Sequence, residues 1–109
     1  MGISVRTATI ADSVQIARLV SGLGYSTSPA QMRKRLESIL PNGDYATAVA
    51  CDGDQVVGFI GTRIGPFYEG DGRYGQIMAL AVSADHQRKG IGRMLLDAAA
   101  CAGSFRPPM

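Results

Sequence analysis

The chain has 109 residues, 46% of them hydrophobic, and a net charge of +2, which suits one globular domain spanning residues 1–109. A net charge this small gives no indication of the basic stripe that nucleic-acid-binding proteins use. No apolar run approaches the roughly 20 residues that cross a bilayer. The N-terminus lacks an export signal, and Cys51 and Cys101 lie too far apart for a zinc or redox motif. We therefore expect a cytoplasmic protein with no metal site that binds neither nucleic acid nor a membrane.

The N-terminal part of the chain predicts a strand followed by a helix. Ile3–Arg6 alternates apolar and polar residues, as a half-buried strand does. Thr9 and Asp12 then have the spacing of a capping box, with Asp in place of the usual Glu or Gln. Apolar residues follow at helical spacing: Ile16, Leu19, Val20 and Leu23. Gly24 provides the helix stop.

A second helix is predicted directly afterwards. Ser28 is the expected N-cap, Pro29 occupies the first helical position, and Gln31 completes a capping box. One apolar stripe follows, formed by Met32, Leu36, Ile39 and Leu40, and Pro41 ends the helix. The basic run Arg33–Arg35 is either a solvated face or a rim that attracts an anionic ligand.

The central part of the chain predicts a hairpin and a third long strand. Tyr45–Cys51 and Val56–Ile64 are joined by a tight turn at Asp52-Gly53, where Gly accepts a positive φ. Gly65–Arg73 has the composition of a loop, and Tyr74–Val82 is an apolar run typical of a strand. With a last helix from about Gly90, the element order is β-α-α-β-β-β-α, an α+β fold.

The stretch HQRKGIGRMLL, residues 86–96, connects this strand to the last helix. A helix N-terminus offers free N–H groups and partial positive charge, and Gly90 and Gly92 remove side chains that would block an anion. Arg88, Lys89 and Arg93 add positive charge. Local chemistry leaves two interpretations open, a phosphate cradle or an ordinary strand-to-helix turn. The stretch is neither a P-loop nor a dinucleotide-binding fingerprint.

The segment QRKGIG, Gln87–Gly92, resembles the Q/R-x-x-G-x-G/A signature of the GNAT family of N-acetyltransferases. The resemblance extends upstream through IMALAVSADHQ and downstream through RMLLDAAA, and the element order fits over residues 3–102. It implies the family's fold, a central, mostly antiparallel sheet with flanking helices.

The resemblance also implies a ligand, acetyl-CoA, as cosubstrate. In the family, the signature binds the pyrophosphate through backbone amides, which here implies a cradle of Gln87, Arg88, Lys89, Gly90, Ile91, Gly92 and Arg93. The preceding strand lines the pantetheine arm with backbone groups, which corresponds to Leu80, Ala81 and Val82. A backbone N–H of that strand polarises the thioester carbonyl. The implied reaction is acetyl transfer to an amine of a small molecule or peptide, whose identity the sequence leaves open.

Complete family members continue with a further strand and a helix whose tyrosine protonates the leaving thiolate. Here the sequence ends in CAGSFRPPM, of which we expect residues 103–109 to be an irregular tail that supplies neither element. The catalytic residues are therefore unassigned. Glu69 and Asp71 are either a general base or solvated loop charges, and Tyr68 and Tyr74 are either a replacement acid or packing residues. His86 is either a turn or packing residue, or else a phosphate contact or proton relay.

Three functions stay open on the sequence alone. The first is a GNAT-type N-acetyltransferase. The second is a truncated, non-catalytic module that binds acetyl-CoA or CoA, or self-associates. The third is an unrelated α+β domain with a generic anion site. Because the strand Tyr74–Val82 would present an open apolar edge, we also expect a homodimer or higher oligomer.

Overall fold

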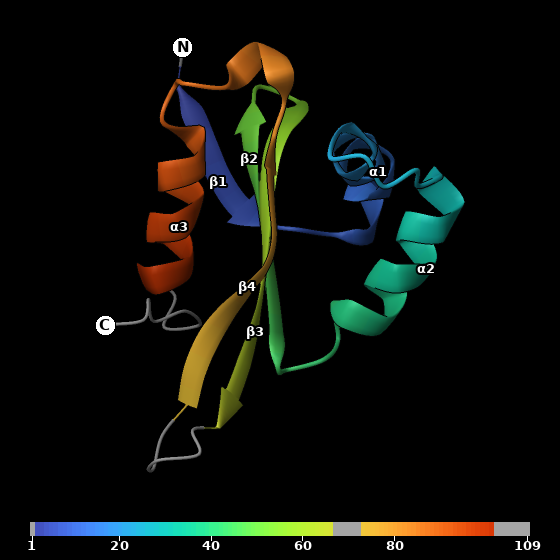
Figure 1. Ribbon diagram of the computed structural model, residues 1–109, viewed down its shortest axis with the longest axis vertical. Coiled ribbons are helices and arrows are strands. Elements are labelled where there is room, and N and C mark those ends of the chain that lie inside the picture. Colours follow the sequence, from blue (N-terminus) through green and yellow to red (C-terminus); the bar gives the residue numbers. More distant parts are fainter. Residues whose placement is uncertain (1, 67–72, 102–109) are drawn as a thin grey trace.

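A computed structural model describes residues 2–66 and 73–101, excluding the side chains at 66, 73, 74, 100 and 101. It contains a four-stranded antiparallel sheet with helices on both faces (Figure 1). The elements in chain order are β1 (Ile3–Thr7), the 3-10 turn η1 (Ile10–Asp12), α1 (Ser13–Gly22), α2 (Pro29–Ile39), β2 (Tyr45–Asp52), β3 (Gln55–Pro66), β4 (Arg73–Val82), the 3-10 turn η2 (Ala84–His86) and α3 (Ile91–Cys101). The predicted order of strands and α-helices is confirmed.

The strands follow one another in the sheet in chain order, β1-β2-β3-β4, so β1 and β4 are its edges within the described residues. The β2–β3 turn contains Gly53 at φ 62°, as the Asp-Gly pair predicts. The boundaries of the loop predicted at Gly65–Arg73 are wrong. Gly65 pairs with Tyr74 and Pro66 with Arg73, because cross-strand pairing outweighs loop-like composition here.

The two faces of the sheet are covered by different helices. Figure 1 shows α1 and α2 on one side and α3 on the other. The buried residues form two clusters accordingly. The first, between the sheet and α1 and α2, includes Ile16, Leu19, Met32, Leu36, Val49, Cys51, Phe59 and Ala81. The second, under α3, consists of Ala50, Val57, Ile60, Ile91, Leu95 and Ala99. No helix within the described residues is long and apolar enough to cross a membrane.

The caps of α1 and α2 follow the sequence closely. Gly24 adopts φ 98° after α1, as a helix stop requires. The Ser28 capping box is confirmed: Gln31 N–H donates to Ser28 Oγ at 3.1 Å, and Ser28 N–H donates to Gln31 Oε1 at 2.8 Å. Leu23, which the sequence places at helical spacing with Ile16, Leu19 and Val20, lies outside the helix. It follows the last helical residue and is 48% exposed, because the chain has already left the helical stripe.

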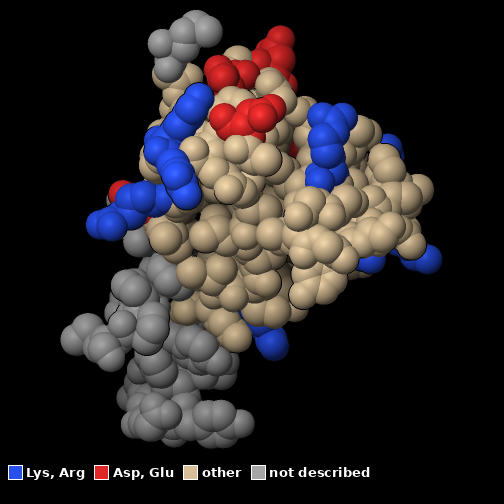
Figure 2. All heavy atoms as spheres, turned by 45° about the horizontal axis from the view of Figure 1, so that its top comes forward, with Lys and Arg blue, Asp and Glu red and all other residues tan. Residues whose placement is uncertain are grey.

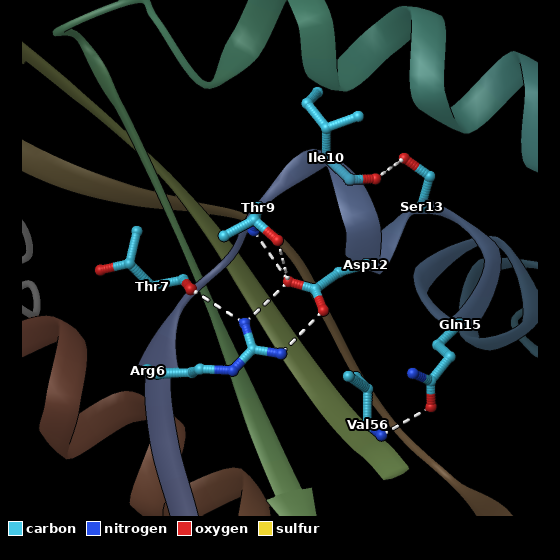
Figure 3. Close-up of polar contacts among 8 residues, drawn as sticks. All are labelled: Arg6, Thr7, Thr9, Ile10, Asp12, Ser13, Gln15 and Val56. Carbon is cyan, nitrogen blue, oxygen red and sulfur yellow. Dashed lines mark hydrogen bonds and ion pairs between the residues drawn. The ribbon is translucent and has the colours of Figure 1, made fainter. Parts of the chain in front are cut away.

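A buried carboxylate ties β1 to the start of α1 (Figure 3). Asp12 accepts from Arg6 Nη1 and Nη2, both at 2.8 Å, and from the Thr9 backbone N–H at 2.8 Å. The Arg6 hydrogen bonds lower the pKa of Asp12 and raise the pKa of Arg6. The predicted capping box of Thr9 and Asp12 is thus present, and the Arg6 guanidinium adds two hydrogen bonds to the Asp12 carboxylate. Gln15 extends the connection, because its Oε1 accepts from Val56 N–H at 2.7 Å.

Close packing fixes α3 against the sheet at Gly58. A Cβ at this position would lie 3.2 Å from Ala81 O, from Ile91 Cγ2 and from Leu95 Cδ1. Gly58 therefore lets the first turns of α3 approach β3 and β4 more closely than any side chain would permit. This contact sets where the N-terminus of α3 lies relative to the end of β4.

Candidate functional site

The edge strand β4 is irregular in its middle. Gly61 pairs with Ala79 and Thr62 with Ile77, which leaves Met78 as an extra residue in a β-bulge. Met78 is 53% exposed. No local sequence signal marks this bulge, because it depends on pairing with β3.

Beyond the bulge, β4 presents backbone groups to its open edge. Ser83 N–H donates to Val57 O at 2.7 Å, and antiparallel ladders alternate between bonded and non-bonded pairs. The next bonded pair is therefore Ala81 with Phe59, whereas Leu80 and Val82 direct their N–H and C=O groups outward. Gln87 Nε2 donates to Val82 O at 3.3 Å, in agreement with this direction. Of the three residues predicted to line the pantetheine arm, Leu80 and Val82 thus direct their backbone N–H and C=O groups to the open edge. The backbone groups of Ala81 are directed toward β3.

The predicted cradle forms a turn with two left-handed residues directly before α3. Arg88 adopts φ 68° and Gly90 φ 78°. Met94 N–H donates to Gly90 O at 3.0 Å, so Gly90 is the N-cap of α3 and has no side chain to satisfy the first-turn N–H groups. A Cβ at Gly92 would meet no atom within 4 Å, so the side of the first turn at this residue is open. In contrast to α2, this helix start is left for an external acceptor.

The cations of the cradle surround this uncapped turn. Arg88 and Lys89 are exposed and make no ion pair among the residues that the structure describes. Arg93 Nε lies 3.3 Å from Asp97 Oδ1, one helical turn further on. Figure 2 shows basic side chains gathered over the start of α3, with acidic side chains beside them. The turn therefore combines free N–H donors with unpaired positive charge, the combination that binds phosphates.

His86 lies at the entry to the cradle and points away from it. Its Nε2 is 3.3 Å from Asp52 Oδ2, at the end of β2. Its side chain is only 14% exposed, and its Nδ1 is buried without a hydrogen-bond partner. Of the interpretations left open by the sequence, the structure favours a turn residue bonded to the hairpin.

A cleft of about 200 Å³ adjoins the cradle on the α1 side of the sheet. Its polar lining includes Gln15, Arg18, Ser83 and Gln87. Arg18 is exposed and makes no ion pair within the described part of the chain. Sequence reasoning missed Gln15 and Arg18, since helical spacing marks them only as the polar face of α1.

The candidate acids and bases are not brought into this site by the structure. Tyr68, Glu69 and Asp71 lie outside the described residues, and the Tyr74 side chain lies outside them too. Gln76 and Met78, near the bulge, are exposed and carry no acidic or basic group. Across residues 2–66 and 73–101, no group of His, Cys, Asp and Glu could hold a metal ion. What the described residues assemble is therefore an uncapped, basic helix start beside an edge strand whose Leu80 and Val82 backbone groups face outward.

Comparisons with known proteins agree with this geometry. A comparison with curated protein sequences finds no match. A GNAT family acetyltransferase of Staphylococcus aureus has a TM-score of 0.86 at 28% identity, covering 94% of this chain and 78% of that one. Glucosamine-6-phosphate N-acetyltransferase of Arabidopsis thaliana (TM-score 0.74, 21% identity, 94% of this chain and 78% of that one) shares the fold. So does a ribosomal-protein-alanine N-acetyltransferase of Brucella melitensis (0.76, 21%, 94% and 72%). The acetyltransferase (GNAT) family model matches residues 15–102, and the chain belongs to this family.

Proposed function

We propose that this protein binds acetyl-CoA at the β4–α3 turn and transfers the acetyl group to an amine. The observation that carries the proposal is the uncapped start of α3, where Arg88 and Gly90 are left-handed and Gly92 leaves open space. This turn follows directly from an edge strand whose Leu80 and Val82 backbone groups face outward. The family to which the chain belongs transfers acyl groups to amines, so a pyrophosphate-bearing acyl donor fits both features.

Each part of the site has a distinct role in this proposal. The first-turn N–H groups of α3 hold the pyrophosphate, and Arg88 and Lys89 neutralise its charge. The outward groups of Leu80 and Val82 offer hydrogen bonds to the amides of the pantetheine arm. Acetyl-CoA supplies an activated acetyl thioester. A β4 backbone N–H near the Met78 bulge would polarise its carbonyl as an oxyanion-type donor.

The acceptor amine has to lose a proton before or during attack on the thioester. Glu69 and Asp71 stay candidates for the base, and Tyr68 and Tyr74 for the acid that protonates the leaving thiolate. The acceptor is a small molecule or a peptide. Proteins of this fold include an aminoglycoside 6'-N-acetyltransferase of Acinetobacter haemolyticus as well as the sugar-phosphate and ribosomal-protein enzymes above, so we propose the amine as the shared chemical requirement.

The experiment is calorimetric titration with acetyl-CoA, comparing wild type with Gly92→Glu. The new carboxylate would lie on the open side of the first turn of α3 and repel a phosphate, so the affinity should fall more than about tenfold. Gly43→Glu is the matched control, because a Cβ there also meets no atom within 4 Å but lies in the α2–β2 loop. No binding by wild type, or equal binding by all three proteins, would refute the proposed site.

A second candidate function is binding of CoA or acetyl-CoA without turnover. The observation that favours it is the composition of the bulge region, where Gln76, Ile77 and Met78 are exposed and none can act as a base. The two functions are separated by following free thiol release from acetyl-CoA with a panel of amines. Thiol release that depends on the amine supports transfer, whereas tight binding without release supports the second function.

A further inference from the structure

The turn η2, which connects β4 to the cradle, is hydrogen-bonded to the far end of β2. His86 is the last residue of η2, and its backbone N–H donates to Ser83 O at 2.9 Å. Its imidazole reaches the end of β2, where Nε2 lies 3.3 Å from Asp52 Oδ2. Asp52 itself is held in the sheet between Ile3 and Gln55. The pair therefore connects the β2–β3 hairpin to the residue that immediately precedes the cradle.

The chemistry of the pair specifies one proton position. An ionised carboxylate only accepts hydrogen bonds, so His86 Nε2 carries the proton that lies between the two groups. The imidazole is 14% exposed and Asp52 is 35% exposed, so the bond is partly shielded from water. His86 Nδ1 is buried and has no partner, which means that the ring has no competing bond to hold it in another orientation.

The segment after His86 needs such an anchor. Arg88 is a non-glycine residue at φ 68°, a strained conformation that persists where neighbouring structure enforces it. Among the described residues, two side-chain hydrogen bonds hold the chain just before it, His86 to Asp52 and Gln87 to Val82 O. Gln87 is bonded to the strand that it follows, while His86 is bonded across the sheet.

We propose that His86 is a positioning residue that, through Asp52, holds the cradle in the conformation in which its N–H groups face a pyrophosphate. Affinity for acetyl-CoA then depends on the end of the β2–β3 hairpin through this bond. The same bond keeps the Asp52 carboxylate turned toward the imidazole. This inference rests on the proposed function, since it assigns His86 a role in binding of the same ligand.

A double-mutant cycle on acetyl-CoA affinity tests the proposal. His86→Leu removes the donor and should weaken binding about fivefold, the equivalent of one ordinary hydrogen bond. Asp52→Ala should weaken it to a similar extent, and the double variant should be no weaker than either single one. His86→Gln keeps an N–H donor at nearly the same reach and should retain most of the wild-type affinity.

Asp54→Ala is the matched control for Asp52→Ala. It removes the same charge from the same turn, but Asp54 is exposed and forms no ion pair among the described residues. It should bind acetyl-CoA at least as tightly as wild type. Failure of wild type to bind would refute the proposed function. Wild-type binding with additive losses in the cycle, or with unchanged affinity in His86→Leu, would overturn the positioning role alone. If His86→Leu does not fold, Asp52→Ala compared with Asp54→Ala tests the bond from the carboxylate side, and equal affinities of these two variants would overturn the positioning role.

A spectroscopic measurement reports on the bond without relying on affinity. The chain contains one histidine, so the imidazole nitrogens give a single set of NMR signals. We expect an Nε2-protonated ring in wild type whose Nε2 proton exchanges slowly with water, faster exchange of that proton in Asp52→Ala, and wild-type behaviour in Asp54→Ala. A ring protonated only at Nδ1 in the wild-type protein would overturn the proposal.

Discussion

Replacing Gly58 by Ala perturbs the contact that places α3 on the sheet. The new methyl group would lie 3.2 Å from Ala81 O, Ile91 Cγ2 and Leu95 Cδ1. Two of these atoms are ends of side chains, but both side chains are buried, with Ile91 at 1% and Leu95 at 0% exposure. The third is the backbone of β4. Either α3 or β4 must therefore move by a few tenths of an ångström.

The expected loss of stability follows from two opposing effects. Overpacking a well-packed core costs about 1–3 kcal/mol. Replacing Gly by Ala restricts the unfolded chain and returns about 0.4–1 kcal/mol. The net loss is about 1–2 kcal/mol, which corresponds to a Tm lower by roughly 4–15 °C for a domain near this size. Because Ile91 is the first residue of α3, the same movement should displace the cradle and weaken acetyl-CoA binding severalfold.

Urea unfolding and calorimetry measure the two effects of Gly58→Ala separately. Gly61→Ala is the control, since it lies in the same strand and a Cβ there meets no atom within 4 Å. It should be as stable as wild type or slightly more stable. If Gly58→Ala unfolds at the same urea concentration as Gly61→Ala, the close contact does not position α3 and the reasoning fails.

Four further outcomes are expected. Asp12→Ala should lower the free energy of unfolding by about 2 kcal/mol at neutral pH. Because Arg6 lowers the pKa of Asp12 below 3.8, the stability difference between wild type and variant should shrink as the pH falls below about 4. An equal stability difference in urea unfolding near pH 2.5 would contradict this reasoning. Arg88→Gly suits φ 68° and removes the charged side chain, so it should weaken acetyl-CoA binding and flatten its salt dependence, and an unchanged salt slope would exclude a phosphate contact. Ser28→Ala should cost about 1 kcal/mol without changing acetyl-CoA affinity, and a changed affinity would show that α2 is coupled to the cradle. Light scattering should show a dimer or larger species, formed through the open β4 edge or an exposed helix face, and a monomer at high concentration would count against it.

The sequence predicts those parts of the fold that local chemistry determines. The Asp52-Gly53 turn and the Ser28–Gln31 capping box are confirmed at their predicted positions, because each depends on residues only a few positions apart. The cradle is recognisable for the same reason. The motif contains Gly90, whose φ of 78° is a backbone requirement that a short stretch of sequence can display.

Other features depend on contacts between distant segments and leave no local mark. The bulge at Met78 arises from pairing with β3, and Gly58 resembles any strand glycine until α3 packs on it. The His86–Asp52 bond joins residues 34 positions apart. Arg88 is the opposite case, since its charge is visible in the sequence but its left-handed backbone is not.

The two helix starts differ in how their stability depends on solution conditions. The first turn of α2 is capped internally, because Ser28 Oγ accepts from Gln31 N–H and Pro29 has no N–H. The first turn of α3 has no such internal partner, so an anion that binds there stabilises that turn in particular. Amide hydrogen exchange should record the difference as ligand-dependent protection at Gly92 and Arg93, with the amides at the start of α2 unchanged. Occupancy of the cradle would thus be measurable as local stability of one helix end, without any turnover.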